Sequence, residues 1–446
     1  MKQGKMSKAG LSDKQDVGKN KILQSSNPIN PNADKWQIKK LGEICYFLNG
    51  LWTGKKPPFQ KVGVIRNTNF TKDCQLDDSD IVYLDVEQSQ FQKRKLKYGD
   101  IILEKSGGGP KQPVGRVVIF DKTEGDFSFS NFTSVIRIKK QEEVDFNFLH
   151  RYLVYSYISG ATEKMQSHST GIRNLKFDEY KEIKIPLPPL PEQQRIVSLL
   201  DECFAAIDKA KANAEQNLKN AKELFESYLQ GVFENGNWET KTIQEVTKVI
   251  NGYAFASKDF KPTNTIKSIK ITNVGVKEFV EEADNYLPEK FKETLKEVQV
   301  KEGNIVIALT RTIISAGLKV AVVPESYDGA LVNQRVAALV PKENLVNQNF
   351  LYFYLTTSGV AKYVLEHVNT LMQPNLSIND LKNMPVPCPN LKQQQTIVRQ
   401  LDALRAETQK LEAVYQKKIT DLEELKKSIL QKAFAGELKT EKALAI

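Results

Sequence analysis

Residues 104–116, EKSGGGPKQPVGR, form the stretch of the sequence whose composition best suits binding chemistry. Three consecutive glycines can expose backbone N–H groups, and the flanking lysines supply positive charge, so the stretch could contact a phosphate. It lacks the Gly-Lys-Ser/Thr ending of a P-loop and the spacing of a dinucleotide fingerprint. Three interpretations follow: a nucleotide pocket, a flexible loop after a strand, or a loop that contacts the DNA backbone.

A short polar segment in each half of the sequence carries side chains that suit base recognition. Residues 168–174 read HSTGIRN, and Gln373-Pro-Asn375 stands at the equivalent place in the second half. Arginine pairs with guanine, and asparagine or glutamine pairs with adenine, so both segments could read base edges. A plain surface turn is the alternative interpretation of the same residues.

Arg311 lies where the second half matches the glycine-rich segment of the first. Residues 309–317 read LTRTIISAG, so the glycine triplet is absent there. Two halves that share a fold but differ in sequence at this loop are more typical of recognition loops than of a common catalytic site. The residues predicted to contact DNA are Lys105, Ser106, Gly107, Gly108, Gly109, Lys111, Arg116, His168, Thr170, Arg173, Asn174, Arg311, Thr312, Arg335, Gln373 and Asn375.

The sequence offers little that could catalyse a reaction. An adenine aminomethylase needs an Asn/Asp-Pro-Pro-aromatic tetrapeptide for the flipped base, and neither Asn27-Pro28 nor Asn30-Pro31 continues in that way. A metal-dependent nuclease needs clustered carboxylates and a lysine, and Glu104-Lys105 has no convincing acidic partner. The four cysteines and three histidines are scattered. We therefore expect a non-catalytic chain that holds no metal and no cofactor of its own.

Length, composition and net charge limit the classes of protein to which the chain can belong. The chain has 446 residues, enough for two to four domains, and its net charge of +10 permits nucleic-acid binding without demonstrating it. We expect no membrane span, because no apolar run reaches the required ~18 residues. The N-terminus lacks the apolar region of a signal peptide, which favours a cytoplasmic protein. Residues 1–35 are lysine-rich and lack aromatics, which predicts a disordered basic tail.

The chain contains an internal repeat: a unit of about 200 residues occurs twice. Residues 97–103 (KYGDIIL) match residues 301–307 (KEGNIVI) at an offset of 204, and Trp36 matches Trp238 at an offset of 202. The small drift in offset is what loop insertions would produce. Two copies are too few for a solenoid, so the repeat predicts a pseudo-two-fold pair.

Each repeat ends in a long amphipathic segment, residues 190–233 and residues 391–434, preceded by a proline cluster that stops the preceding element. Such a helix, roughly 65 Å long, needs a partner, and the constant offset of 201 indicates that the two pair with each other. Their lysines and arginines are expected on solvated outer faces. The larger apolar residues of the predicted seam include Ile196, Leu200, Ile207, Leu218, Phe225, Tyr228, Ile397, Leu401, Leu404, Leu411, Ile419, Leu422, Leu425 and Ile429.

The remainder of each repeat predicts short strands followed by a helix. Strands are expected at 101–103, 116–120 and 134–138, and at 305–309, 320–323 and 336–340; helices are expected at 146–159 and 349–368, and polar loops at 166–174 and 369–375. The predicted fold class is α+β, with two similar globular domains joined by two long antiparallel coiled-coil helices. The predicted segments are a tail 1–35, a domain 36–189, a helix 190–235, a domain 236–390, a helix 391–436 and a tail 437–446.

These motifs, taken in order, resemble the specificity (S) subunit of type I restriction–modification systems. Each half begins Trp-x-x-x-x-Leu/Ile-x-Glu-Ile/Val, carries a Gly-Asp/Asn-Ile-Ile/Val strand and a proline cluster, and enters a Gln-Gln-x-Ile-Val helix that ends at Phe233 or at Phe434-Ala-Gly-Glu-Leu. Single motifs are weak, but their duplicated order is specific. The resemblance covers residues 36–438.

The resemblance implies a DNA-binding subunit without an active site. Each globular part would be a target recognition domain for one half of a bipartite, asymmetric site in double-stranded DNA, and the helices would act as a spacer. Two modification subunits, which hold S-adenosylmethionine and methylate adenine N6, would dock on it, and motor–nuclease restriction subunits would join. Two alternatives are a specificity module of a type II enzyme with fused methylation and cleavage, and a coiled-coil scaffold that binds only protein.

Overall fold

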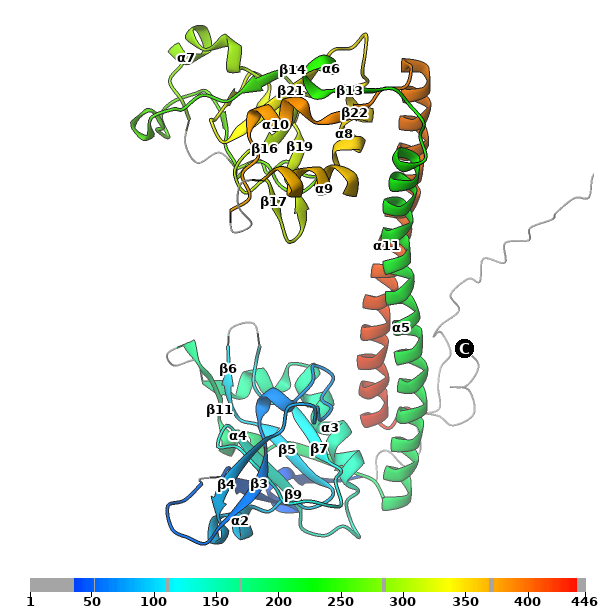
Figure 1. Ribbon diagram of the computed structural model, residues 1–446. Coiled ribbons are helices and arrows are strands. Elements are labelled where there is room, and N and C mark those ends of the chain that lie inside the picture. Colours follow the sequence, from blue (N-terminus) through cyan, green and yellow to red (C-terminus); the bar gives the residue numbers. More distant parts are fainter. Residues whose placement is uncertain are drawn as a thin grey trace, which may run out of the picture. The chain divides into compact units, whose positions relative to one another are not determined.

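The computed structural model of the protein describes residues 36–51, 53–109, 112–167, 171–282, 286–368 and 373–438 (Figure 1). These residues form two compact units: unit 1 comprises residues up to 209 and from 422 onward, and unit 2 comprises residues 210–421. The expected basic tail 1–35 lies outside the described residues, as do the predicted contacts Lys111, His168 and Thr170.

Unit 1 is built on an antiparallel sheet of the order β2(Cys45–Asn49)-β9(Thr133–Ile138)-β5(Asp100–Glu104)-β7(Val117–Phe120). The three middle residues of the strand β5, Ile101 to Leu103, are apolar and buried because both faces of the strand are covered. Ile101 and Leu103 belong to one buried cluster, whereas Ile102 belongs to another. A buried central strand therefore holds the segment that follows Glu104 in a fixed place.

Two further layers cover this sheet. One cluster lies under a smaller sheet of the order β4(Val82–Glu87)-β3(Phe59–Ile65)-β8(Phe127–Phe129). The other contains helix α3 (Phe146–Ile158), whose first turn is capped by the Asp145 carboxylate accepting from the Phe148 N–H at 2.9 Å. The remaining elements of unit 1 are β1 (Gln37–Lys40), α1 (Leu41–Ile44), α2 (Gln88–Arg94), β6 (Ser106–Gly108), β10 (Gln166–Ser167), β11 (Arg173–Leu175), α4 (Phe177–Lys181) and β12 (Lys184–Leu187).

Unit 2 repeats this plan and confirms the internal duplication. Its main sheet has the order β14(Thr247–Asn251)-β21(Val336–Pro341)-β16(Ile305–Ala308)-β19(Val320–Val322), and helix α8 (Gln348–Leu355) is capped by Asn347 as α3 is by Asp145. The remaining elements are β13 (Thr240–Thr242), α6 (Ile243–Val246), β15 (Ser268–Ile269), α7 (Lys290–Thr294), β17 (Ile313–Ile314), β18 (Gly317–Leu318), β20 (Leu331–Val332), α9 (Ser358–His367), α10 (Ile378–Asn383) and β22 (Pro385–Pro387). Short 3-10 turns are η2 (Asn67–Asn69), η3 (Ala161–Met165), η5 (Ser257–Asp259), η6 (Lys296–Val298) and η7 (Glu325–Tyr327).

Two predicted elements differ from the structure. The single helix expected at 349–368 is broken into α8 and α9, because the Thr357 hydroxyl caps a fresh helix start by accepting from the Val360 N–H. The loop expected at 166–174 contains two short strands, β10 and β11, that pair antiparallel. Neither change was visible in apolar periodicity, because a threonine cap and a two-residue strand leave that pattern intact.

The two long helices are confirmed as α5 (Leu190–Glu234) and α11 (Leu391–Phe434). The predicted seam residues that are buried are Ile196, Leu200, Ile207, Leu401 and Ile419. Those that are half-buried are Leu218, Phe225, Ile397, Leu404, Leu422 and Ile429.

Three seam predictions were wrong. Leu411 is 41% exposed, and Tyr228 and Leu425 are also exposed. Leu229 and Leu430 are fully buried in the unit cores, one position after the predicted Tyr228 and Ile429, so the prediction was off by one residue near the end of each helix. The seam of a helix pair is narrow, and an apolar residue at its edge stays in solvent.

Each long helix starts at a buried glutamine. Gln193 accepts a hydrogen bond from the Asp145 N–H at 2.9 Å and donates to the carbonyls of Glu143 and Pro188. The equivalent Gln394 makes the same set of bonds with the chain before α8 and with Pro389. The amide thereby ties the first turn of the helix to the loop that caps α3 or α8.

Each long helix ends at a phenylalanine in the core of the unit in which it finishes. Phe434, at the end of α11, lies 5.4 Å from Phe148 and 4.9 Å from Tyr152, ring centre to ring centre. Phe233, near the end of α5, lies 5.2 Å from Phe350. A helix that starts in one unit is therefore anchored in the other.

Replacing Gln193 by Leu should destabilise the chain by about 1–3 kcal/mol, because the Asp145 N–H and two carbonyls would be left buried without partners. Urea denaturation of the full chain measures the change. Gln194→Leu is the matched control, because Gln194 is exposed and its replacement should change stability by less than about 0.5 kcal/mol. Equal effects of the two substitutions would contradict this role of the buried amide.

Candidate nucleic-acid interface

One end of the unit 1 sheet extends into a small tip made of three short strands in the order β10-β11-β6 (Figure 1). The strand register places Arg173 opposite Gly108 and Asn174 opposite Ser106. Ser106 and Asn174 are joined by a hydrogen bond between their side chains. The structure thus brings together candidates from two segments that are 65 to 68 residues apart in the sequence.

In the described part of the glycine-rich segment, Gly109 and Gln112 pair with each other in an antiparallel bridge. The N–H of Gly109 donates to the Gln112 carbonyl at 3.0 Å, and the N–H of Gln112 donates back at 3.1 Å. A side chain on Gly108 would come within 2.6 Å of the Gln112 carbonyl oxygen, so glycine is required there. These contacts favour a shaped protein loop and weigh against a nucleotide pocket.

Two cationic side chains lie at this tip. Arg173 is half-buried and forms an ion pair of 2.9 Å with the exposed Glu163. The Lys105 ammonium donates to the Asn49 side chain at 3.2 Å, and burial lowers the pKa of Lys105. Both cations are positioned by protein contacts before any ligand arrives.

Arg116 does not belong to the interface, and its prediction as a DNA contact was wrong. Its guanidinium is buried and donates two 2.8 Å hydrogen bonds to the carboxylate of Glu104, and a third bond of 2.7 Å to the Phe70 carbonyl. The pair ties the end of β5 to the turn at residues 67–70. Glu104 neutralises the charge of Arg116 within the protein. Arg116 therefore stabilises the base of the tip.

The tip of unit 2 gathers Arg311, Gln373 and Asn375. Thr310 and Asn375 form a β-bridge, and the Arg311 N–H donates to the Asn375 side chain at 3.3 Å. Arg335 is exposed, and its carbonyl accepts from the Leu309 N–H at 2.8 Å, which places it at the same end of the sheet.

Thr312 was also predicted to contact DNA, and the structure contradicts this. Its side chain is fully buried, and its hydroxyl accepts from the Leu376 N–H at 3.4 Å. Its N–H donates to the Pro374 carbonyl. Thr312 therefore joins two segments of the tip and presents no group to a ligand.

A pocket of about 540 Å³ opens beside Arg311. Its walls combine the polar Arg311 and Gln373 with apolar side chains, of which Ile314 and Leu365 are about half exposed. The remaining lining residues are Ile313, Ser315 and Pro374. This apolar wall was not predicted from the sequence, because two isoleucines that follow Thr-Arg-Thr resemble the start of an ordinary strand.

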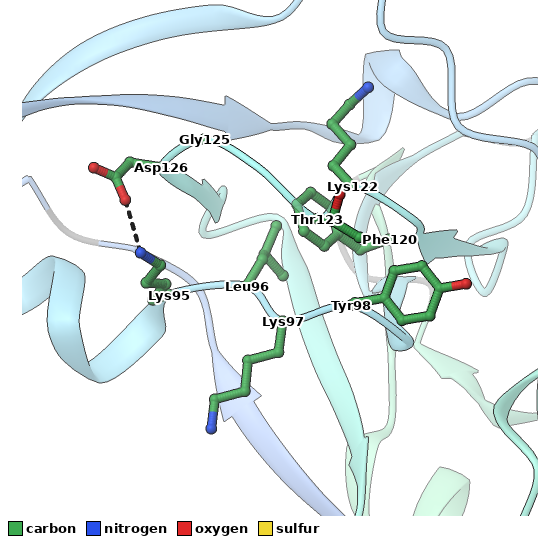
Figure 2. A pocket seen from close by; sticks show the side chains of 9 residues that line it. All are labelled: Lys95, Leu96, Lys97, Tyr98, Phe120, Lys122, Thr123, Gly125 and Asp126. Atoms are coloured by element: carbon green, nitrogen blue, oxygen red, sulfur yellow. Dashed lines mark hydrogen bonds and ion pairs between the residues drawn. The ribbon is translucent and has the colours of Figure 1, made fainter.

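A second pocket, of about 500 Å³, lies in unit 1 around the turns that precede β5 and follow β7 (Figure 2). It contains Lys95, Lys97 and Lys122, but Lys95 is paired with Asp126 at 2.8 Å and Lys122 is paired with Asp78. Figure 2 shows the amino groups of Lys97 and Lys122 pointing in different directions. The pocket is at the opposite end of these strands from the tip, and its lysines do not converge on a common ligand.

No group of three potential metal ligands is found among the described residues. Burial lowers the pKa of His150 to about 4, so its ring is neutral, and its Nε2 atom bonds the Val117 carbonyl at 3.2 Å. That histidine is a core residue of unit 1. Within the described part of the chain, no helix is long and apolar enough to cross a membrane.

Comparison with known proteins decides the family. The model of the type I restriction modification DNA specificity domain matches the chain twice, over residues 33–219 and residues 235–421. The chain belongs to this family. It is a DNA-recognition subunit of a type I restriction–modification system.

Several curated specificity subunits are similar to this chain. The MjaVIII specificity subunit of Methanocaldococcus jannaschii is 27% identical over 302 residues, which cover 65% of this chain and 70% of that protein. The EcoKI specificity subunit of Escherichia coli K12 is 25% identical over 449 residues, with 90% and 89% covered.

Solved structures show the same fold. A chain from a study described as "Structural basis underlying complex assembly and conformational transition of the type I R-M system" aligns with a TM-score of 0.73 at 18% identity, covering 92% of this chain and all of that one. The HsdS subunit from Thermoanaerobacter tengcongensis aligns with a TM-score of 0.55 at 18% identity, covering 93% and 99%. Each matched domain of this specificity subunit includes part of a long helix.

Replacing Arg116 by Ala should destabilise the specificity subunit by about 3–5 kcal/mol, because the Glu104 carboxylate would stay buried without its counter-charge. Replacing both residues by Leu should recover much of the loss, since no buried charge remains. Urea denaturation tests both variants. A change in the methylated sequence with unaltered stability would instead restore Arg116 as a DNA contact.

Proposed function

We propose that each unit reads one half of a bipartite, asymmetric site in double-stranded DNA. The main observation behind this proposal is that the four-stranded main sheets of the two units have the same strand order, whereas the residues at the tips differ. Unit 1 presents a glycine hairpin with Ser106, Arg173 and Asn174, and unit 2 presents Arg311 beside Asn375. A shared scaffold fixes the position of the tip, and different tip residues would select different bases.

The chain itself acts without catalysis in this proposal. Methylation of adenine N6 belongs to modification subunits, two per complex, which hold S-adenosylmethionine and dock on the specificity subunit. Restriction subunits, which carry the motor and nuclease, join the same complex. The proposal is supported by the family to which the chain belongs. The complex would work in the cytoplasm, where the DNA is.

Methylation mapping tests the proposed function. The full chain would be co-expressed with its modification subunit, and methylated adenines would be located by sequencing the host DNA. The expected result is one motif of two different half-sites separated by a fixed gap. Palindromic or scattered methylation would contradict it. Lack of DNA binding by the assembled complex at low salt would favour the protein-binding scaffold instead.

Gene neighbourhood separates the type I system from a type II system in which methylation and cleavage share one polypeptide. A separate gene for a motor–nuclease next to this one is the expected arrangement. A single fused methyltransferase–nuclease gene beside it would support the type II alternative.

We further propose that α5 and α11 set the gap between the half-sites. Inserting four residues between Lys209 and Ala210 and four between Asp421 and Leu422 adds about 6 Å to each helix. Base pairs are spaced by ~3.4 Å, so the mapped gap should grow by about one to two base pairs while both half-sites keep their sequences.

The same four residues inserted after Asn235, beyond the end of α5, provide the control and should leave the gap unchanged. Half-site sequences that change with helix length would rule out the spacer role. A gap that stays constant in the double insertion would do so as well.

A further inference from the structure

The tips of the two units can be aligned through their backbone hydrogen bonds. In unit 1 the Leu175 N–H donates to the Lys105 carbonyl at 2.8 Å. In unit 2 the Leu376 N–H donates to the Leu309 carbonyl at 2.9 Å. Lys105 and Leu309 are therefore equivalent, although the residues that follow them share no sequence pattern.

Counting two residues onward makes Arg311 the equivalent of Gly107. Both have left-handed backbones, with φ of +95° at Gly107 and +49° at Arg311. Glycine adopts that region without steric cost, whereas a residue with a side chain is strained there. Unit 2 thus holds an arginine at a position for which the fold favours glycine, and such strain is commonly retained at functional sites.

A second cation of unit 2 is also exceptional. The N–H of Glu104 bonds the Arg116 carbonyl, and the N–H of Ala308 bonds the Lys319 carbonyl, so Lys319 is the equivalent of Arg116. Its ammonium donates to the Ile271 carbonyl at 2.8 Å. The carboxylate that compensates Arg116 is replaced by the methyl group of Ala308.

In the described part of unit 2, no carboxylate forms an ion pair with Lys319 or Arg311, whereas Glu104 forms one with Arg116 in unit 1. Burial, and then the nearby charge of Arg311, lower the pKa of Lys319. An electron-rich ligand beside Arg311 would offset this positive charge.

The pocket beside Arg311 indicates what kind of ligand fits. Ile313, Ile314 and Leu365 give it an apolar wall, which offers nothing to a phosphate but accepts the face of a base or a thymine methyl group. A guanidinium at the rim can form two parallel hydrogen bonds with O6 and N7 of guanine. The combination suits a base edge in the major groove better than the DNA backbone.

We propose that Arg311 is a specificity-determining residue of unit 2, which reads a guanine in the half-site of that unit from the rim of the apolar pocket. The left-handed backbone sets the direction of the Arg311 side chain, and the charge of Lys319 raises the positive potential near it. This inference rests on the proposed function, because it names the base chemistry of one recognition tip.

The discriminating variant is Arg311→Gly, which installs the residue that unit 1 has at this position. It removes the guanidinium and relieves the backbone strain, so the thermal unfolding temperature should stay the same or rise. In the mapped motif of the full chain with its modification subunit, one guanine of one half-site should become degenerate, with preference falling about tenfold or more. The other half-site should be unchanged. Arg311→Lys, which keeps the charge without the planar fork, should lose the same preference.

Lys277→Gly is the matched control. Lys277 is also a left-handed residue of unit 2, at φ +60°, and its side chain pairs with Glu226 on α5. Lys277 does not line the pocket, so that variant relieves comparable strain and should leave the motif intact.

The outcomes separate the two levels of the proposal. A wild-type motif without two half-sites would remove the proposed function and this inference with it. A bipartite wild-type motif that Arg311→Gly leaves unchanged would overturn only the inference. Methylation that falls equally at all sites would also overturn it, because Arg311 would then contact a phosphate. Loss of folding in Arg311→Gly would identify Arg311 as structural and overturn it too.

Discussion

The architecture depends on the buried amide at the start of each long helix. Gln193 and Gln394 each satisfy a backbone N–H and two carbonyls that would otherwise be buried without partners, so the first helical turn and the loop before α3 or α8 become one rigid piece. Phe434 and Phe233 then fix the far ends in aromatic clusters. Each helix is therefore fixed by buried contacts at its start and at its end, which is what the proposed spacer role requires.

The duplicated sequence was enough to predict the fold class and both long helices, because proline clusters, heptad spacing and a constant offset all report the same elements. It was insufficient for the tips. Arg116 looked like a DNA contact because charge is visible in a sequence and burial is not; its partner Glu104 is 12 residues away and faces it only after β5 and β7 pair. Lys319 was not predicted from the sequence either. A lysine next to an apolar strand does not reveal in the sequence whether a carboxylate faces it in the folded chain.

The two units show how one scaffold can hold different recognition chemistry. In unit 1 the cation beneath the tip is neutralised by Glu104, and the left-handed position is filled by Gly107, so shape and hydrogen-bonding groups remain at the surface. In unit 2 the carboxylate is lost and the left-handed position carries Arg311, so charge is concentrated there. Both changes occur at the ends of buried strands, where the sheet tolerates them because its apolar core is untouched.

The helix pair has diverged in a complementary way. In unit 1 the Lys426 ammonium of α11 lies 4.9 Å from the Phe204 ring of α5, and in unit 2 the Arg405 guanidinium of α11 lies 5.1 Å from the Phe225 ring of α5. By the repeat offset of 201, Arg405 corresponds to Phe204 and Lys426 corresponds to Phe225. Pairing of α5 with a second α5 would set ring against ring, and pairing of α11 with a second α11 would set two cations together. Cation–π contacts of about 0.5–1 kcal/mol each therefore favour the pairing of unlike helices, as a single chain requires.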